Sequence, residues 1–336
     1  MTADIQAPVA RTIPDRIETP FRRWKRWEVL LAGVAVAIFI FNAFASPHFL
    51  NASNLSDATY NFTEQGIIAF AMALLIIAGD IDLSVASIVA VSSTGMGAAA
   101  TAGGGPAVLV VVGLVVGLAC GAVNGFIVTR FRVPSIVVTI GTMSLFRGIS
   151  YVVLGDQVYR HYPPGFDWFG QGYVWWVFTF EFLLFLLLAM AFAVLLHRTV
   201  FGRRIYVIGN NPVAAQFSGV RVDRIRFILF LLTGLMSGVA AILLTSRIAS
   251  TRPTIATGYE LQAVTIVVLG GVNILGGSGT ILGVFIAAFV IGLVTFGFGL
   301  FNVPGVVQSI FTGALLIGVI ALPIVWGRVA ARLRAR

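Results

Sequence analysis

Apolar stretches long enough to cross a membrane recur about ten times along this chain of 336 residues, at roughly 20 residues per helical crossing. Polar or glycine-rich segments separate them. The pattern predicts an all-α polytopic membrane protein. Its transmembrane helices are expected at residues 28–45, 62–79, 84–101, 106–129, 135–154, 175–196, 227–247, 258–275, 280–299 and 306–326. The second, third and eighth are short and interrupted by glycine, which leaves open whether they span fully.

Composition agrees with a membrane protein and excludes an ordinary soluble domain. Hydrophobic residues make up 58% of the chain and charged residues only 10%, whereas a soluble domain carries about 25% charged residues. The net charge of +9 would suggest a nucleic-acid partner in a soluble protein, but membrane topology explains it better. The single Cys120 excludes an internal disulfide framework and a cysteine metal cluster.

The basic residues predict the orientation of the chain. With ten crossings and a cytoplasmic N-terminus, the cytoplasmic segments are a tail at 1–27, the loops between alternate helices and a basic tail at 327–336. Those segments hold all of the 22 lysines and arginines except Arg147, Arg160, Arg247 and Arg252. Cytoplasmic loops of membrane proteins are enriched in lysine and arginine. We therefore expect a multi-pass transmembrane domain at 28–326 with both termini in the cytoplasm.

Two weaker patterns concern the packing of the helices. Val133-Pro134 and Val303-Pro304 each follow a glycine-rich helix and fall on opposite sides of the membrane in this topology. An inverted repeat, with helices two to five matching seven to ten, would produce this arrangement, although chance similarity of two Val-Pro pairs is an alternative. Glycines at four-residue spacing, Gly113, Gly117, Gly121 and Gly125, predict close helix–helix packing in a compact bundle.

The largest polar segment inside the apolar sequence covers residues 197–226. It carries six arginines, Arg198, Arg203, Arg204, Arg221, Arg224 and Arg226. Asn210 or Asn211 before Pro212 predicts a helix start, and Gly219 predicts its end after Phe217. Ala214, Ala215 and Phe217 give this short helix an apolar patch. We interpret the segment as a docking surface for a soluble partner, with a helix lying on the lipid surface as the alternative.

Two further segments carry polar groups between apolar helices. In Gly79 to Ser87, buried carboxylates are costly unless paired or hydrated, so Asp82 and Ser84 are candidates to line a translocation path. The alternative is a tight turn in which Asp82 caps the next helix. In Val268 to Thr280 the glycines suggest a phosphate loop, but the Gly-Lys-Ser/Thr ending is missing, which excludes nucleotide binding. Asn273 in this segment is a third path candidate.

The remaining polar residues give no sign of catalysis. Glu64, Glu181 and Glu260 fall near the starts of predicted helices, and we expect their side chains to snorkel to the membrane interface. The three histidines are far apart, without metal-ligand spacing. The aromatic segment 155–174 is typical of a headgroup-level belt, or of a surface that meets an external partner. The sequence predicts no enzyme, no cofactor and no metal site.

The chain resembles the inner-membrane permease subunits of bacterial ABC importers for monosaccharides, a family that includes ribose, xylose, galactose, rhamnose and autoinducer-2 permeases. Three segments carry the resemblance over roughly residues 30–325: Gly79 to Ser87, Gly202 to Gly219 and Leu269 to Gly283. The first is similar to the family pattern Gly-Gly-Ile-Asp-Leu-Ser-Val-Gly-Ser. Asp80 and Ala86 stand where that pattern has glycine. The third is closest to the rhamnose and autoinducer-2 branch.

The resemblance implies a permease of about ten helices in the bacterial inner membrane, which carries a sugar by alternating access. It implies three partners: a cytoplasmic ATP-binding subunit that hydrolyses ATP, a periplasmic sugar-binding protein and a second permease subunit, identical or paralogous. Neither the sugar nor that identity follows from the sequence. The residues expected to dock on the ATPase are Asn210, Asn211, Pro212, Ala214, Ala215, Phe217, Ser218 and Gly219. The rival hypothesis is an ion-coupled secondary transporter that works without an ATPase, although no clear pair of midplane acids supports it.

Overall fold

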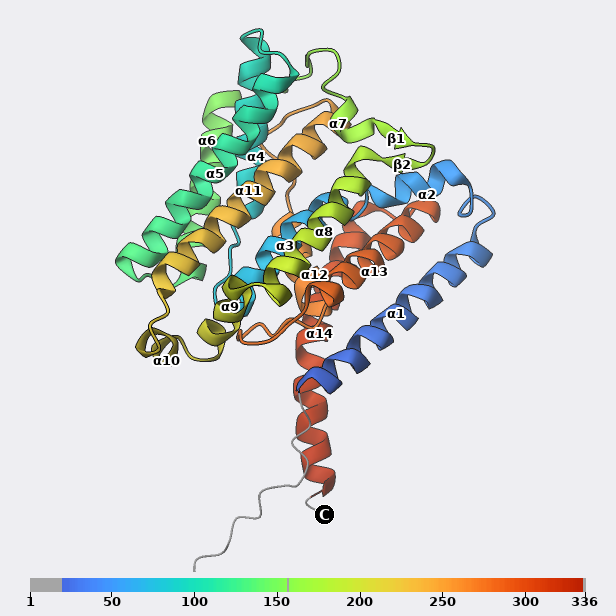
Figure 1. The fold of residues 1–336 in the computed structure, drawn as a ribbon. Helices are drawn as coiled ribbons and strands as arrows, with labels where there is room; N and C mark the ends of the chain where they lie inside the picture. The colour runs from blue at the N-terminus through green and yellow to red at the C-terminus, as the bar shows by residue number, and fades with distance from the viewer. Residues whose placement is uncertain (1–19, 156, 335–336) are drawn as a thin grey trace, which may run out of the picture.

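A computed structural model describes residues 20–155 and 157–334 of the chain (Figure 1). The described residues form an α-helical bundle with one two-stranded antiparallel hairpin. In order, the elements are α1 (Pro20–Ala45), α2 (Ala52–Thr59), α3 (Thr63–Ile77), α4 (Val85–Thr101), α5 (Pro106–Phe131), α6 (Ser135–Leu154), α7 (Trp168–Gln171), β1 (Tyr173–Trp175), β2 (Phe178–Thr179), α8 (Phe180–Arg198), α9 (Val200–Asn210), α10 (Pro212–Phe217), α11 (Val222–Ile248), α12 (Tyr259–Leu269), α13 (Ile281–Leu300) and α14 (Gly305–Arg334).

The helices confirm an all-α polytopic membrane protein. Within the described part of the chain, seven helical segments are long and apolar enough to cross a bilayer, and three shorter apolar helices accompany them. Together they coincide one for one with the ten predicted crossings. Helix α1 begins and helix α14 ends toward the same lower end of the bundle as α10 (Figure 1), which is the arrangement that an even number of crossings gives.

The structure corrects two of the predicted crossings. The eighth, 258–275, contains only the helix α12, whose 11 residues extend about 16 Å and cannot span a hydrocarbon core of about 30 Å. Irregular chain precedes and follows it, so this crossing is discontinuous. The sixth, 175–196, begins not as a helix but in the β1–β2 hairpin, and α8 starts only at Phe180.

Helix α3 lies at the centre of the bundle. Each of its residues, from Thr63 to Ile77, is buried, and α8, α9, α11, α12 and α13 pack around it. A helix that is apolar on all sides is expected in such a position. The turn at the end of α3, residues 78–84, is thereby held between the other helices.

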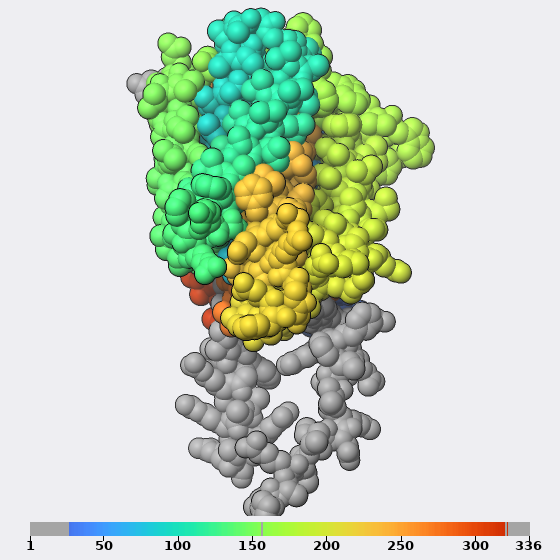
Figure 2. Space-filling view, turned by 60° about the vertical axis from the view of Figure 1, so that its left-hand side comes forward, coloured from blue at the N-terminus to red at the C-terminus, as the bar shows by residue number. Residues whose placement is uncertain are grey.

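The glycine stripe of α5 packs against α11, as predicted. The two helices lie side by side in both views (Figures 1 and 2) and form the most extensive helix–helix interface of the described residues. Gly117 faces the backbone of Gly234 and Gly238, and Gly121 faces that of Phe230. Small residues let helices approach backbone to backbone where lipid provides no hydrophobic drive.

This interface predicts a specific sensitivity to one methyl group. A Cβ atom at Gly121 would lie 2.4 Å from the carbonyl oxygen of Phe230, so Gly121→Ala must push α5 and α11 apart. We expect the free energy of unfolding to fall by about 1–3 kcal/mol, measured as a lower thermal midpoint in detergent. Gly141→Ala in α6 is the matched control, because its Cβ meets nothing within 4 Å. Equal midpoints for the two variants would contradict the packing argument.

The contacts between helices repeat between two halves of the chain, helices two to five (α3–α6) and helices seven to ten (α11–α14). Four kinds of contact in one half have counterparts in the other: α5–α11 with α13–α3, α4–α5 with α12–α13, α4–α6 with α12–α14, and α4–α11 with α12–α3. Matching contacts between corresponding helices support the repeat over chance similarity of two Val-Pro pairs.

Candidate functional site

The three segments that carry the resemblance meet at one end of the bundle. The amide of Gly277 donates a hydrogen bond to the carbonyl oxygen of Ile77, 2.9 Å away, at the end of α3. Asn210 Nδ2 donates to the carbonyl oxygen of Gly277 at 3.2 Å and to that of Tyr206 at 2.7 Å. Gly209 packs so closely on Ile77 that a Cβ would lie 1.8 Å from its carbonyl oxygen. The polar segment, the glycine-rich loop and the α3–α4 turn therefore form one contiguous site.

Helix α10 has the boundaries and caps that the sequence predicts. Asn211 is the N-cap, and its Oδ1 accepts a hydrogen bond from the amide of Ala214 at 2.9 Å. Pro212 occupies the first turn, where its missing N–H costs nothing. Gly219 follows the helix with φ +81°, a conformation that glycine adopts freely. The short helix is thus fixed by local signals in the chain.

The side chains of α10 divide into an inner and an outer set. Val213 is 61% exposed and Phe217 90% exposed, whereas Ala215 is fully buried. Ala215 therefore does not belong to the exposed apolar patch in which the sequence analysis placed it, and the patch consists of Val213, Ala214 and Phe217. The yellow segment that holds α10 and the start of α11 reaches the surface at the lower end of the bundle in Figure 2. An exposed patch of several apolar side chains, unlike a single exposed one, commonly marks an interaction site.

The helix before this patch is absent from the helices predicted above. Residues 200–210 form α9, with the side chain of Thr199 capping its N-terminus. Its buried face carries Gly202, Ile205 and Ile208, a spacing of three that fits one side of a helix. That periodicity was the available signal, and the charged residues Arg203 and Arg204 between the apolar positions concealed it.

Asp82 and Ser84 lie together in the α3–α4 turn, and both are fully buried. Asp82 Oδ1 accepts hydrogen bonds from the amide and the hydroxyl of Ser84, at 2.9 and 2.6 Å. Its Oδ2 accepts one from the hydroxyl of Thr233 in α11, at 3.1 Å. The carboxylate thus organises the start of α4 and ties the turn to α11. Its burial favours the tight-turn interpretation in this conformation.

Asn124 completes this network. Its Nδ2 donates to the Ser84 hydroxyl at 2.7 Å, and its side chain is fully buried in α5. Asn124 and Thr233 escaped the sequence analysis, although a lone amide inside an otherwise apolar membrane helix is a signal for an interhelical hydrogen bond. Asn273, in contrast, lies apart from Asp82. It is exposed, and its Oδ1 accepts from the amide of Leu275 at 3.1 Å, so it shapes the glycine-rich loop.

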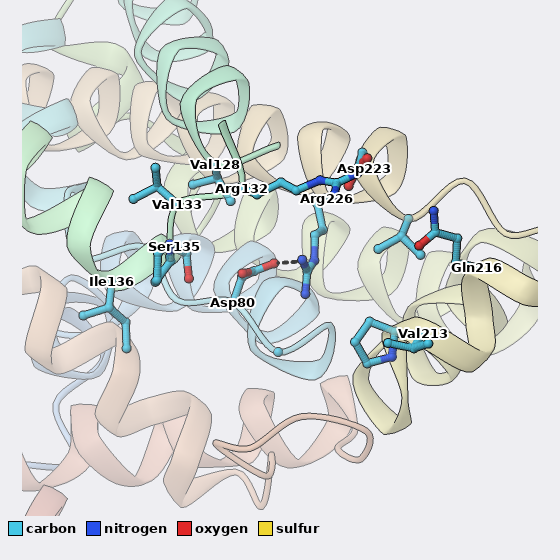
Figure 3. Close-up of a pocket in the computed structure, with 14 residues that line it drawn as sticks. Asp80, Val128, Arg132, Val133, Ser135, Ile136, Val213, Gln216, Asp223 and Arg226 are labelled. Carbon is cyan, nitrogen blue, oxygen red and sulfur yellow. Dashed lines mark ion pairs between the residues drawn. The ribbon is translucent and has the colours of Figure 1, made fainter. Parts of the chain in front are cut away.

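A hollow of about 500 Å³ opens beside α10. It is bounded by the α3–α4 turn, the corner between α5 and α6, α10 and the first turns of α11 (Figure 3). Asp80 Oδ2 and Arg226 Nε face each other there at 2.9 Å, in an ion pair that lacks the angles of a hydrogen bond. Burial raises the pKa of Asp80 above its usual value, and the Arg226 guanidinium acts in the opposite direction. Asp80 and Asp223, rather than Asp82, are the acids that line this hollow.

The opposite end of the bundle holds a second group of charges. Glu64 and Glu181 are buried, so the prediction that their side chains snorkel to the interface is wrong. Nε and Nη2 of Arg247 donate to Glu64 Oε1 at 3.0 and 2.6 Å. Glu181 interacts electrostatically with both residues. Neither of its carboxyl oxygens has a hydrogen-bond partner among the described residues.

The aromatic segment near these charges is folded onto the helices. Tyr159 and Thr251 form a backbone bridge, and the Tyr162 hydroxyl lies 2.5 Å from that of Thr251. Burial raises the pKa of Tyr162 to about 12, so this hydroxyl is neutral at physiological pH. Phe166 is fully buried, whereas Trp175 and Trp176 in the hairpin are exposed. The segment is thus a cap with an aromatic edge, in which only the hairpin resembles a headgroup-level belt.

The chain is similar in sequence to permease components of several bacterial import systems. The family described as the permease component of the branched-chain amino acid transport system matches residues 54–320. A ribose import permease protein of Bacillus subtilis (strain 168) is 34% identical over 274 residues, which cover 81% of this chain and 85% of that protein. An autoinducer 2 import system permease protein of Salmonella paratyphi B is 31% identical over 307 residues, covering 90% and 92%. One from Escherichia coli O9:H4 (strain HS) is 32% identical over 300 residues, covering 88% and 91%. No solved structure matches.

Proposed function

We propose that this chain moves a monosaccharide across the bacterial inner membrane by alternating access. It belongs to the family of sugar permeases of ABC importers. These permeases are transport subunits, and a separate subunit of the importer hydrolyses ATP. Its partners in this proposal are a cytoplasmic ATP-binding subunit, a periplasmic sugar-binding protein and a second permease subunit. Both termini and α10 face the cytoplasm. Ribose, rhamnose and autoinducer-2 are the candidate substrates.

The observation that best supports this function is that the polar segment exposes apolar side chains on α10 while the residue before α10 is hydrogen-bonded to the interior of the bundle. Val213 and Phe217 of α10 are exposed, while Asn210, two residues before α10, binds Gly277, which in turn binds Ile77. A partner that holds α10 therefore has a short hydrogen-bonded connection to the central helix α3. Amphipathic helices commonly dock by placing apolar side chains in a groove.

In the proposed cycle, ATP binding brings the ATPase subunits together and moves the two α10 helices with them. The α9–α10 segment transmits this movement to α3 and α11. Because α5 and α11 are packed backbone to backbone through glycines, they move as one body. The permease itself forms and breaks no covalent bond, and selectivity comes mainly from the external binding protein.

Affinity purification from native membranes tests the proposal directly. We expect an ATP-binding subunit to co-purify with this chain. After reconstitution with the ATPase and the binding protein, uptake should need ATP, with labelled ribose, rhamnose and autoinducer-2 compared and leucine included because of the family description. Uphill uptake by the isolated chain, driven by a proton or sodium gradient, would instead establish the ion-coupled alternative.

A further inference from the structure

The α3–α4 turn is attached to one face of α11 at two points. Asp80 pairs with Arg226, and Asp82 accepts a hydrogen bond from Thr233. Arg226 and Thr233 are seven residues apart, which is two helical turns, so both lie on the same side of α11 about 10 Å apart along its axis. The two attachments fix the position and the tilt of the turn relative to α11.

The two attachments differ in their access to water. Asp82 and Thr233 are fully buried, and their hydrogen bond belongs to the network with Ser84 and Asn124. The Asp80 and Arg226 side chains are 8% and 26% exposed and border the hollow (Figure 3). The two facing atoms, Asp80 Oδ2 and Arg226 Nε, are themselves buried but make no hydrogen bond, and a buried ion pair is strong only when hydrogen bonds satisfy its charges. Asp82, in contrast, accepts three hydrogen bonds. The Asp80–Arg226 attachment is therefore the more easily broken of the two, while the inner attachment acts as a pivot.

The same hollow connects this ion pair with the docking helix. Pro212, Val213 and Gln216 of α10 form its opposite wall. Only residues 218–221 separate α10 from the start of α11, so movement of α10 passes along the chain to Arg226. A change in the width of the hollow therefore changes the distance between Arg226 and Asp80.

We propose that Asp80 and Arg226 are positioning residues that transmit movement of α10 to the α3–α4 turn, acting as a latch at the cytoplasmic side of the transport path. This inference rests on the proposed function, because it assigns the ATPase as the source of the movement. When α10 is drawn outward, the pair separates and the turn pivots about Asp82. When α10 returns, the pair closes again.

The test uses the complete transporter, purified with its ATPase and reconstituted in lipid nanodiscs. Hydrogen–deuterium exchange of residues 78–84 is compared with and without a non-hydrolysable ATP analogue. In the wild type we expect nucleotide to change the exchange of this turn. In Asp80→Asn, Arg226→Gln and the double variant, the nucleotide-dependent change should be smaller by about fivefold. The double variant should be no more affected than the worse single variant, because the two side chains act through each other.

Arg132→Gln is the matched control, since Arg132 borders the same hollow and is exposed. Its exchange response should equal that of the wild type. Unchanged thermal midpoints and ATPase co-purification show that the Asp80 and Arg226 variants are folded and assembled. If the Asp80 and Arg226 variants assemble with the ATPase and respond to nucleotide as the wild type does, the latch proposal is wrong, while the proposed function still stands. A wild-type chain that binds no ATPase would overturn the proposed function and the latch with it.

Discussion

Replacing Phe217 with aspartate is expected to release the ATPase subunit from the permease. Phe217 is 90% exposed at the end of α10, and an aromatic side chain that fills a pocket on a partner typically contributes about 2 kcal/mol or more to binding. A charge at this position adds a desolvation cost. We expect binding to the ATPase to weaken by at least about 30-fold, measured by titrating the purified ATPase against the permease in nanodiscs, and ATP-dependent uptake to fall accordingly.

The control for this variant is Trp176→Asp. Trp176 is also largely exposed, but it lies in the hairpin at the opposite end of the bundle, which the proposed topology places away from the cytoplasmic subunit. It should leave ATPase binding unchanged. Both variants should insert into the membrane at wild-type levels, because neither side chain contributes to the core. A Phe217→Asp permease that binds the ATPase with wild-type affinity would show that docking does not occur through α10.

Replacing Arg247 with methionine is expected to destabilise the bundle strongly. The variant keeps the packing of the long side chain but leaves Glu64 and Glu181 buried without a cation. Removing one partner of a buried ion pair costs about 3–5 kcal/mol, here because Glu64 loses both of its hydrogen bonds from Arg247. The thermal midpoint in detergent should fall well below that of Gly121→Ala.

Two further variants separate the charge effect from other causes. Arg252→Met removes an arginine that is exposed on the same side of the bundle and should leave the midpoint nearly unchanged. The double variant Glu64→Gln/Arg247→Met removes one of the two stranded carboxylates and should recover part of the lost stability. If the double variant were as unstable as Arg247→Met, the destabilisation would come from packing and not from charge.

Features that depend on residues close together in the chain could be predicted from the sequence. The apolar stretches predict the helices because a bilayer crossing imposes a length and a composition, and the glycines of α5 predict a close helix contact. Asn211, Pro212 and Gly219 predict α10 to the residue, because caps and breaks are decided within one helical turn. The docking role of α10 is a prediction of the same kind and is still to be tested.

Features that depend on contacts between residues far apart in the chain could not be predicted from the sequence. Glu64 reads as an interfacial acid until Arg247, 183 positions later, is brought beside it. Ala215 reads as exposed because the helices that cover it are not visible in a six-residue pattern. The pairing of Asp80 with Arg226 needs the fold that places the α3–α4 turn on α11. Helix α9 was not predicted for a different reason: arginines lie between the apolar residues of its buried face and obscure the helical period.

The burial of α3 has a consequence for how this protein is made. Helix α3 has no lipid-facing surface, and the helices that enclose it, among them α11, α12 and α13, are synthesised long after it. A nascent chain that has emerged only as far as α6 thus holds an apolar helix without its final neighbours, together with an unpaired Glu64. The final packing of α3 and the ion pair of Glu64 with Arg247 can therefore form only after translation has supplied the second half of the chain.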